Sequence, residues 1–368
     1  MDLTGRRVLV TGATGFIGGR LVEKLTLERG VVVRALVHDF RNAAWLSRTA
    51  AEIVYGDITD PLSLAQAVQG CSLVFHCAAS TSTIYEEAYR VNVTGTYYLL
   101  EAAREAGVER LVLVSSAAVH EPPTPDHTID ENTPFVDEKA TAYARTKLAA
   151  EQLALRYGQD HGLAVVVLRP TLVYGPRSLF WTVNYVSRIK GKRLALWRGM
   201  DGTNDFVYVD DVVQALILAA TAPVAGEAFL IGSGCSTGWF EYLSCYAAMD
   251  GATISIWPRW LLETLALVFD QLDHGIKYLG QHPSPWKTPL LLGLRAVRRI
   301  LRPWRRLERW EIRLFTQHRT FDITKARCLL GYQPHVDKTE PLRETEIWLR
   351  TQGYLLDQNH MGRGWPAE

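Results

Sequence analysis

Tyr143 and Lys147 stand four residues apart in the stretch TAYARTKLAAEQLALRY (141–157), where the pattern predicts the start of a helix. Residues four apart on a helix share a face, so the phenol and the ammonium should lie side by side. A phenol has a pKa of about 10, too high for a base at neutral pH, and a nearby cation lowers that pKa. The pair is therefore either an acid/base catalyst or an exposed pair with no role beyond local packing.

Three glycines are spaced by three residues in TGATGFIG (11–18), between an apolar run and a helix-like segment. In that setting the first permits a tight turn, the second lets backbone approach a pyrophosphate, and the third lets helix and strand pack closely. The helix N-terminus would present N–H groups to the phosphates. An ordinary turn is the plain alternative. We predict a dinucleotide site that includes Gly12, Thr14, Gly15, Phe16, Ile17 and Gly18.

The elements that would position these residues alternate between apolar runs and helix-like segments. The apolar runs are RVLVT (7–11), VVVRALV (31–37), SLVFHCA (72–78), RLVLVSS (110–116) and LAVVVLRP (163–170). Such alternation predicts an α/β fold with a doubly wound parallel sheet of the Rossmann type. We assign residues 1–175 to this domain, with 205–222 returning to it. The irregular segments 176–204 and 223–368 are assigned to a smaller substrate-binding domain.

The composition excludes several classes of protein. Hydrophobic residues make up 48% of the 368 residues, and 40 basic residues nearly balance 39 acidic ones, so no net field favours nucleic acid. The five cysteines show no metal-binding spacing and fit reduced thiols in the cytoplasm. We expect no metal site and no signal peptide, and since no apolar run reaches about 18 residues we expect no membrane span.

The end of the second predicted strand bears on cofactor choice. An acidic residue there would bind the adenosine ribose hydroxyls and favour NAD. Val37 occupies that place, and His38 and Arg41 follow it. Cations beside an apolar residue favour the 2′-phosphate of NADP, unless Val37 only packs and the protein accepts either NAD(H) or NADP(H).

Taken in order, these motifs resemble the extended short-chain dehydrogenase/reductase family, of the NAD(P)-dependent epimerase/dehydratase type. The resemblance rests on nine segments: TGATGFIG, YGDITD, VFHCAA, NVTGT, VSSAAVH, YARTK, RPTLVYGP, FVYVDDVV and FDITKARCLLGYQP. It implies catalysis by Ser116, Tyr143 and Lys147. Tyr143 would exchange a proton with a carbinol oxygen during hydride transfer, Ser116 would hydrogen-bond that oxygen, and Lys147 would hold the nicotinamide ribose.

The resemblance also implies further contacts with the cofactor and a homodimer. Asp57 and Ile58 would hold the adenine, and Asn92 would support the central helix. The remaining groove residues would be Ala78, Ala79, Pro170 and Val173. Ser115 is expected to be structural.

Other polar residues have two interpretations each. His76 lies in an apolar run and is either a hydrogen-bonded core residue or a ligand. His120 either faces the substrate or ends a strand. Asp210 and Asp211 are expected to cap the helix that follows them.

The substrate is indicated only by departures from the resemblance. Nucleotide-sugar members usually carry Asn and Arg where this chain has Leu172 and Asn204, although Arg177, Arg198 or Arg319 could compensate. Several segments look more like the 3β-hydroxysteroid dehydrogenase-like branch. We therefore predict an apolar ring or lipid-linked alcohol or ketone as substrate. The alternatives are a nucleotide-sugar epimerase, dehydratase or reductase, and a non-catalytic NADP-sensing regulator, although regulators tend to lose the Tyr or the Lys.

The segment 294–314 is amphipathic and strongly basic. Its apolar residues recur every three or four positions: Leu294, Val297, Leu301, Trp304, Leu307, Trp310 and Leu314. Residues 295–313 contain eight Arg and two Glu, and Pro303 should break or kink the helix. It would either cover the substrate pocket with a solvated basic face or dock on an anionic membrane to collect a lipid-like substrate.

Overall fold

The computed structural model describes residues 3–28, 31–40, 43–122, 124, 127–281, 287–301, 306–335 and 337–355. The chain forms two compact units. The first contains Met1–Gly175, Asp205–Ser236 and Thr320–Lys338, and the second contains Pro176–Asn204, Thr237–Arg319 and Thr339–Glu368. Residues 223–236 and 320–338, which the sequence analysis assigned to the substrate domain, therefore lie in the first unit.

A seven-stranded sheet forms the centre of the first unit, in the order β11-β7-β5-β4-β1-β2-β3. All neighbouring strands are parallel, which confirms the predicted fold class. The apolar runs form these strands because a sheet covered on both faces buries nearly every side chain. The strands are β1 (Arg7–Thr11), β2 (Val32–Val37), β3 (Glu52–Tyr55), β4 (Leu73–His76), β5 (Arg110–Val114), β7 (Ala164–Pro170) and β11 (Glu227–Ile231).

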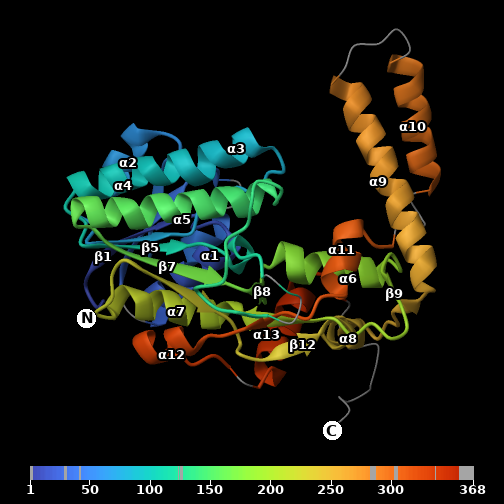
Figure 1. The fold of residues 1–368 in the computed structure, drawn as a ribbon. Coiled ribbons are helices and arrows are strands. Elements are labelled where there is room, and N and C mark those ends of the chain that lie inside the picture. The colour runs from blue at the N-terminus through green and yellow to red at the C-terminus, as the bar shows by residue number, and fades with distance from the viewer. Residues whose placement is uncertain are drawn as a thin grey trace. The chain divides into compact units, whose positions relative to one another are not determined.

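Helices cover both faces of this sheet (Figure 1). On one face lie α2 (Pro61–Ala67), α4 (Gly95–Glu105) and α5 (Ala142–His161), which enclose a core that includes Leu9, Leu64, Leu100, Ala154 and Tyr157. On the other face lie α1 (Phe16–Glu23), α7 (Val209–Thr221) and α12 (Thr324–Leu330). Because helices cover both faces of the sheet, a binding site can form only at the ends of its strands.

The segment expected to return to the first domain does so as a strand and a helix. Its strand β10 (Thr203–Tyr208) pairs with β8 (Leu172–Tyr174) rather than joining the large sheet. Shorter elements are α3 (Tyr85–Tyr89), β6 (Thr128–Ile129), β12 (Ser236–Gly238), β14 (Thr320–Phe321), the π-helical turns Lys24–Glu28, Arg90–Thr94 and Leu179–Val183, and the 3-10 turns Ala44–Arg48 and Ala117–Val119.

The second unit is mainly helical and has an aromatic core. Trp239, Tyr185, Tyr246 and Phe315 are fully buried in it. The buried Glu311 carboxylate pairs with Arg188 at 2.5 Å and accepts a 3.0 Å hydrogen bond from the Tyr185 hydroxyl. Its elements are α6 (Asn184–Lys190), β9 (Ala195–Leu196), α8 (Trp239–Asp250), β13 (Ser255–Ile256), α9 (Arg259–Gln281), α10 (Lys287–Leu301), α11 (Arg309–Phe315) and α13 (Thr339–Thr351).

The amphipathic segment 294–314 does not form one continuous helix, in keeping with the expectation that Pro303 breaks or kinks it. The residues belong to two helices, because α10 ends at Leu301 and α11 begins at Arg309. Ile312 and Phe315 of α11 are buried, whereas Val297 and Ile300 of α10 are exposed. Of the apolar positions predicted in α11, Trp310 is 42% exposed and Leu314 is half-buried, so the predicted stripe is not the buried side of that helix. Pro303 and Trp304 lie outside the described residues. Among those that are described, no helix is long and apolar enough to cross a bilayer.

Candidate active site

The glycine loop after β1 requires glycine for steric reasons. Gly12 has a φ of +66°, and a Cβ there would lie 2.7 Å from the backbone nitrogen of Ala78. A Cβ on Gly18 would lie 2.4 Å from the carbonyl oxygen of Gly12. Gly15 caps α1 without a side-chain hydrogen bond, so the first turn of the helix offers its N–H groups to a ligand. The loop therefore fits a pyrophosphate.

The loop opens at the point where the strand order reverses. Since β2 lies on one side of β1 and β4 on the other, the carboxyl ends of β1 and β4 flank a crevice. The backbone N–H of Ala78 donates to Thr11 Oγ1 at 3.2 Å, which joins the two loops. Ser116 follows β5, the next strand after β4, and so lies at the same edge of the sheet.

Ser116 and Tyr143 are brought together by two helix caps. Ser116 caps the turn Ala117–Val119 and its Oγ accepts from the Ala118 N–H at 3.2 Å. Thr141 caps α5, which places Tyr143 in the first turn of that helix. Desolvation raises the pKa of Tyr143, and the neighbouring Ser116 hydroxyl acts to lower it.

Lys147 lies one turn further along α5 and is 4% exposed. Its Nζ donates a 2.5 Å hydrogen bond to the carbonyl of Val114, the last residue of β5. Burial lowers the pKa of Lys147 to about 8, against the attraction of Glu151. The sequence predicts that this ammonium, together with the positive charge of an oxidised nicotinamide, lowers the pKa of Tyr143. In the structure the net pKa shift of Tyr143 is upward, because desolvation of the phenol dominates.

Asn92 lies in a π-helical turn ahead of α4, a type of irregularity that is frequent at functional sites. Its Oδ1 accepts from the Ser80 N–H at 2.7 Å, and its Nδ2 donates to Thr146 Oγ1 at 2.9 Å. The amide thereby joins the loop after β4 to the helix that carries Tyr143 and Lys147. Asn92 supports the central helix, as the resemblance implied.

His76 is a hydrogen-bonded residue of the protein core, which is the first of its two interpretations. It is 1% exposed, and its two ring nitrogens lie 2.8 Å from Thr11 Oγ1 and 2.9 Å from Thr96 Oγ1. Thr96 Oγ1 donates to the Asn92 carbonyl, so it accepts from Nε2–H of His76. Burial lowers the pKa of His76 to about 3.

A buried polar network beside Ser116 was missed by the sequence analysis. Ser115 donates to the Glu151 carboxylate at 2.6 Å, and Glu151 pairs with Arg169. Arg169 also donates to His120 Nε2 at 2.9 Å, so His120 faces this network rather than a substrate. An arginine inside the apolar run 163–170 was the available signal, since a buried charge requires a partner. Glu151, four residues after Lys147, is that partner.

Asp210 and Asp211 lie in the first turn of α7, but Tyr208 is its capping residue. Asp210 pairs with Arg20 of α1 at 2.6 Å, and Asp211 accepts from His335 at 2.5 Å. The two acids therefore connect α7 to other elements of the first unit instead of capping it. No group of three or more His, Cys, Asp or Glu side chains in the described part of the chain could hold a metal ion.

The predicted adenine residues follow β3. Asp57 Oδ1 accepts from the Thr59 N–H at 2.8 Å. Burial acts to raise the pKa of Asp57, but the hydrogen bonds from Thr59 and the charge of His38 hold it below its usual range. Ile58 is buried against Gly95, since a Cβ added to Gly95 would lie 2.9 Å from Cγ1 of Ile58. Ala79 is exposed near the crevice, while Pro170 and Val173 are buried at the end of β7 and in β8.

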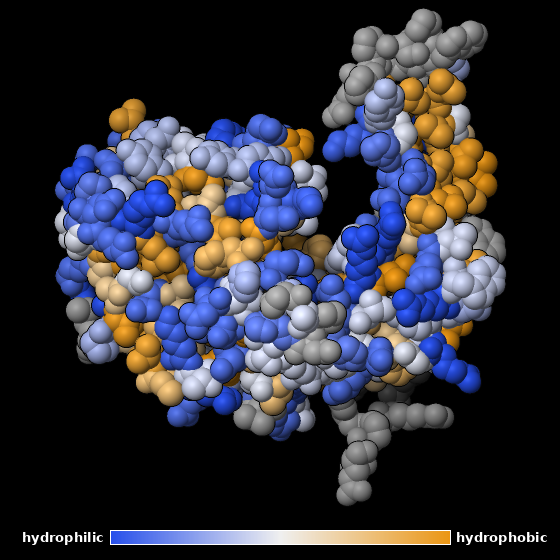
Figure 2. All heavy atoms as spheres, in the orientation of Figure 1, coloured by the Kyte–Doolittle hydropathy of each residue, from blue (hydrophilic) through white to orange (hydrophobic). Residues whose placement is uncertain are grey.

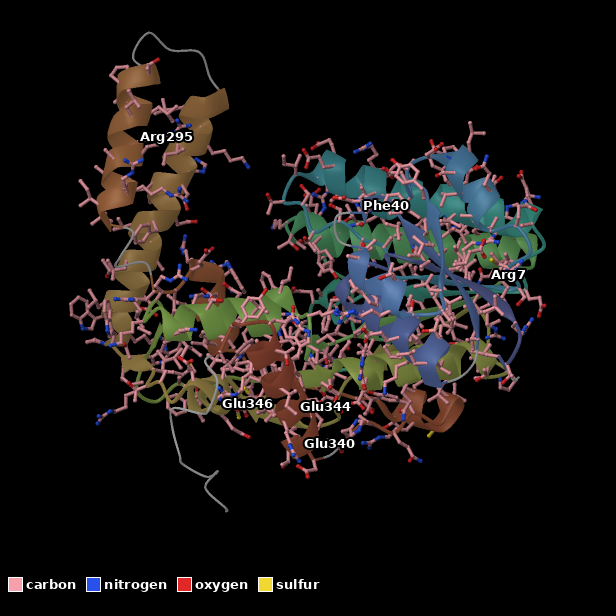
Figure 3. All side chains as sticks on the ribbon, turned by 180° about the vertical axis from the view of Figure 1, so that it is seen from behind. Arg7, Phe40, Arg295, Glu340, Glu344 and Glu346 are labelled. Carbon is pink, nitrogen blue, oxygen red and sulfur yellow. The ribbon has the colours of Figure 1, made fainter. Side chains whose placement is uncertain are left out.

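The end of β2 contains the residues that bear on cofactor choice. Val37 is buried as the last residue of β2, and His38 is exposed. Asp39 is half-buried and was not named by the sequence analysis. Phe40, labelled in Figure 3, stacks on Tyr55 with ring centroids 5.9 Å apart. Arg41 lies outside the described residues.

A sequence model of the NAD dependent epimerase/dehydratase family matches residues 8–232. The chain belongs to this family. The match spans the glycine loop, the strand ends and the α5 helix described above. It confirms the family indicated by the motifs and, at the level of the family, the prediction of an NAD-dependent enzyme.

Similar proteins extend the comparison over nearly the whole chain. The chain is 30% identical to sterol demethylase protein B of Methylococcus capsulatus, over 94% of this chain and 99% of that protein. It is 30% identical to a 3 beta-hydroxysteroid dehydrogenase/Delta 5→4-isomerase of Mycobacterium tuberculosis, over 92% and 89%. The solved structure of MoeE5 in complex with UDP-glucose and NAD matches with a TM-score of 0.68 and 26% identity, over 94% and 99%.

The structure describes each residue that the sequence analysis considered for binding a diphosphate. Asn204, where nucleotide-sugar members usually carry Arg, is 2% exposed, and Leu172 is half-buried in β8. Among the arginines that could compensate, the Arg319 guanidinium donates to Gln317 at 3.0 Å. Arg177 is half-buried and Arg198 is exposed.

Proposed function

We propose that this chain is an NAD(P)-dependent oxidoreductase that transfers hydride at a secondary alcohol or ketone. The Ser116 and Tyr143 hydroxyls, which neighbour each other at the sheet edge that carries the glycine loop, support this proposal most directly. A surface pair without a role would not be expected to stand beside a second hydroxyl in that position.

Each residue has a proposed task. The bound nicotinamide supplies the hydride donor or acceptor and, when oxidised, a positive charge. Tyr143 donates or accepts the proton on the carbinol oxygen, and Ser116 hydrogen-bonds the same oxygen and fixes its orientation. Lys147, held at the Val114 carbonyl in the structure, would bind the nicotinamide ribose and stabilise the phenolate.

The proposed substrate is an apolar ring or lipid-linked alcohol or ketone. Two relatives that match over nearly the whole chain carry sterol or steroid names, which supports this class. Asn204 and Leu172 in place of polar diphosphate contacts support it further. The solved structure with bound UDP-glucose keeps a nucleotide-sugar reaction as the second candidate. Use of NADP, a homodimer and a cytoplasmic location remain predictions from the sequence.

The experiment is a comparison of two substrate classes and two variants. The purified protein is given a 3β-hydroxysterol or UDP-glucose with NAD or NADP, and the reduced nicotinamide and the sugar products are measured. Tyr143→Phe should retain cofactor binding and lower sterol turnover by roughly 100-fold or more, the scale of lost proton transfer. Tyr89→Phe, an exposed tyrosine on α3, is the matched control and should keep full turnover.

Two results would reject parts of the proposal. Near-normal turnover by Tyr143→Phe removes this residue from proton transfer. Turnover of UDP-glucose with no reaction of the sterol replaces the proposed substrate class by the second candidate.

A further inference from the structure

Helices α9 and α10 form a hairpin within the second unit. They lie side by side in Figure 1, and the Arg298 guanidinium pairs with Asp273 at 2.6 Å. A Cβ on Gly275 would lie 3.3 Å from Leu294, so the helices are in close contact there. The first half of α9 packs on α11, with Ala266 and Phe269 buried. The hairpin is therefore joined to the core of the unit at one end of α9.

Large apolar side chains on this hairpin remain exposed. Trp260, Leu267 and Tyr278 recur along α9 at intervals that keep them on one side of a helix, and they are 67%, 44% and 54% exposed. On α10, Leu290, Val297 and Ile300 also share one side and are 51%, 44% and 72% exposed. Figure 2 shows the resulting hydrophobic area running along the hairpin. Continuous apolar area of this kind marks an interaction surface.

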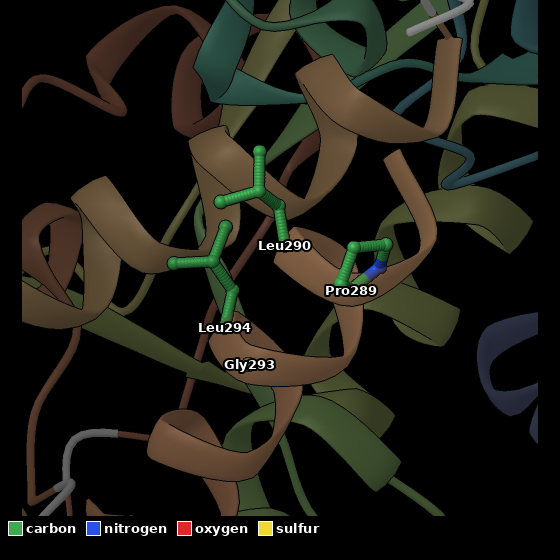
Figure 4. Close-up of a pocket in the computed structure, with 4 residues that line it drawn as sticks. All are labelled: Pro289, Leu290, Gly293 and Leu294. Atoms are coloured by element: carbon green, nitrogen blue, oxygen red, sulfur yellow. The ribbon is translucent and has the colours of Figure 1, made fainter. Parts of the chain in front are cut away.

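One part of this surface is a shallow hollow on α10 with a volume of about 410 Å³. It is lined by Pro289, Leu290, Gly293 and Leu294 (Figure 4). None of these side chains carries a polar group. The hollow can therefore accept hydrocarbon but offers no side-chain hydrogen bond to a polar ligand.

Positive charge lies next to the apolar side of α10. Arg295, Arg298 and Arg299 are exposed, and the sequence of α10 contains no acidic residue. Arg295 is labelled on this helix in Figure 3. An amphipathic helix with large apolar side chains on one side and arginines on the other suits the boundary between lipid headgroups and acyl chains. Exposed Trp and Tyr are also enriched at that boundary.

We propose that the hairpin of α9 and α10 is a docking surface for a bilayer that contains anionic lipid. The exposed side chains Leu290, Val297 and Ile300 enter the acyl boundary, and Arg295 and Arg299 bind acidic headgroups. The surface covers α9 and α10 rather than the whole segment 294–314, since Ile312 and Phe315 of α11 are buried in the core of the unit. A second copy of the chain is a poorer occupant, because it would bring the same arginines to the contact.

The proposal is tested with the full-length protein and sedimenting vesicles. Vesicles of phosphatidylcholine with phosphatidylserine should bind the protein at low salt and release it as salt rises, whereas phosphatidylcholine alone should bind little. Arg295→Glu with Arg299→Glu should lower the partition coefficient at least about tenfold, since each basic residue contributes to binding. The control with equal charge change is Arg156→Glu with Arg343→Glu, which should bind like the wild type.

A second pair of variants tests the apolar contact. Val297→Ser with Ile300→Ser should weaken vesicle binding without lowering the melting temperature, because both side chains are exposed. Leu62→Ser with Leu179→Ser, exposed leucines outside the hairpin, should leave binding unchanged.

Several outcomes overturn the proposal. These are no sedimentation at low salt, equal binding to neutral vesicles, hairpin variants that bind like the wild type, or a dimer in solution that the hairpin variants abolish. The readout does not require turnover, so its failure leaves the proposed oxidoreductase activity unaffected, and a failure of that activity leaves this docking surface unaffected.

Discussion

The hydroxyl of Ser115 donates a 2.6 Å hydrogen bond to the carboxylate of Glu151. Glu151 also holds the guanidinium of Arg169, and all three residues are at most 3% exposed. Ser115 precedes Ser116 and Glu151 lies one turn after Lys147, so a buried ion pair adjoins two proposed catalytic residues. Its contribution to stability can be measured independently of any substrate.

We expect Glu151→Gln to lower the free energy of unfolding by about 3–5 kcal/mol, because it leaves the Arg169 charge buried without its partner. Urea denaturation measures this change. Glu263→Gln, which breaks the exposed pair between Arg259 and Glu263, is the control and should cost less than about 1 kcal/mol. If both variants lower the free energy of unfolding by the same small amount, Arg169 tolerates the loss of the Glu151 carboxylate.

The close contact of Gly18 with Gly12 gives a second prediction. A Cβ at Gly18 would lie 2.4 Å from a backbone oxygen, so Gly18→Ala must separate α1 from the loop. Titration with NAD(H) and NADP(H) should show at least about tenfold weaker binding, since the loop geometry holds the pyrophosphate. Gly280→Ala, where no atom lies within 4 Å of the new Cβ, should bind normally. Unchanged affinity in Gly18→Ala would reject this loop as the phosphate site.

Local patterns made part of this structure predictable from the sequence. The glycine loop and the start of α5 are encoded within a few neighbouring residues, so their spacing fixes their conformation. The pairing of Glu151 with Arg169 joins helix α5 to strand β7. Spacing within one element does not predict contacts between two elements. The segment 294–314 shows the same limit. Its period identifies the apolar side of a helix but does not show whether that side is buried in the core or exposed to solvent. The pairing of β11 with β7 likewise joins strands that are about 60 residues apart in the sequence, so local patterns do not predict it.

His76 gives a prediction for pH. Burial lowers its pKa from 6.5 to about 3, so the unfolded chain binds a proton between these values and the folded chain does not. The stability that this group contributes is complete above pH 6.5 and falls as the pH drops toward 3, by as much as roughly 5 kcal/mol at 1.36 kcal/mol per pKa unit. His76→Gln should flatten the pH dependence of urea unfolding in this range, and the exposed His274→Gln should not. An unchanged slope in His76→Gln would assign the acid sensitivity to other groups.

The last prediction concerns cofactor choice at the end of β2. Because Val37 is buried there and His38 is exposed, we expect NADP(H) to bind at least as tightly as NAD(H). Arg41→Ala should weaken NADP(H) and spare NAD(H), since a guanidinium binds the 2′-phosphate that only NADP carries. Asp39→Ala tests the alternative, in which the carboxylate of Asp39 binds the ribose hydroxyls of NAD. Isothermal titration of both cofactors into both variants distinguishes the two residues. A strong preference for NAD(H), lost in Asp39→Ala and kept in Arg41→Ala, would reject the NADP prediction and assign cofactor recognition to Asp39.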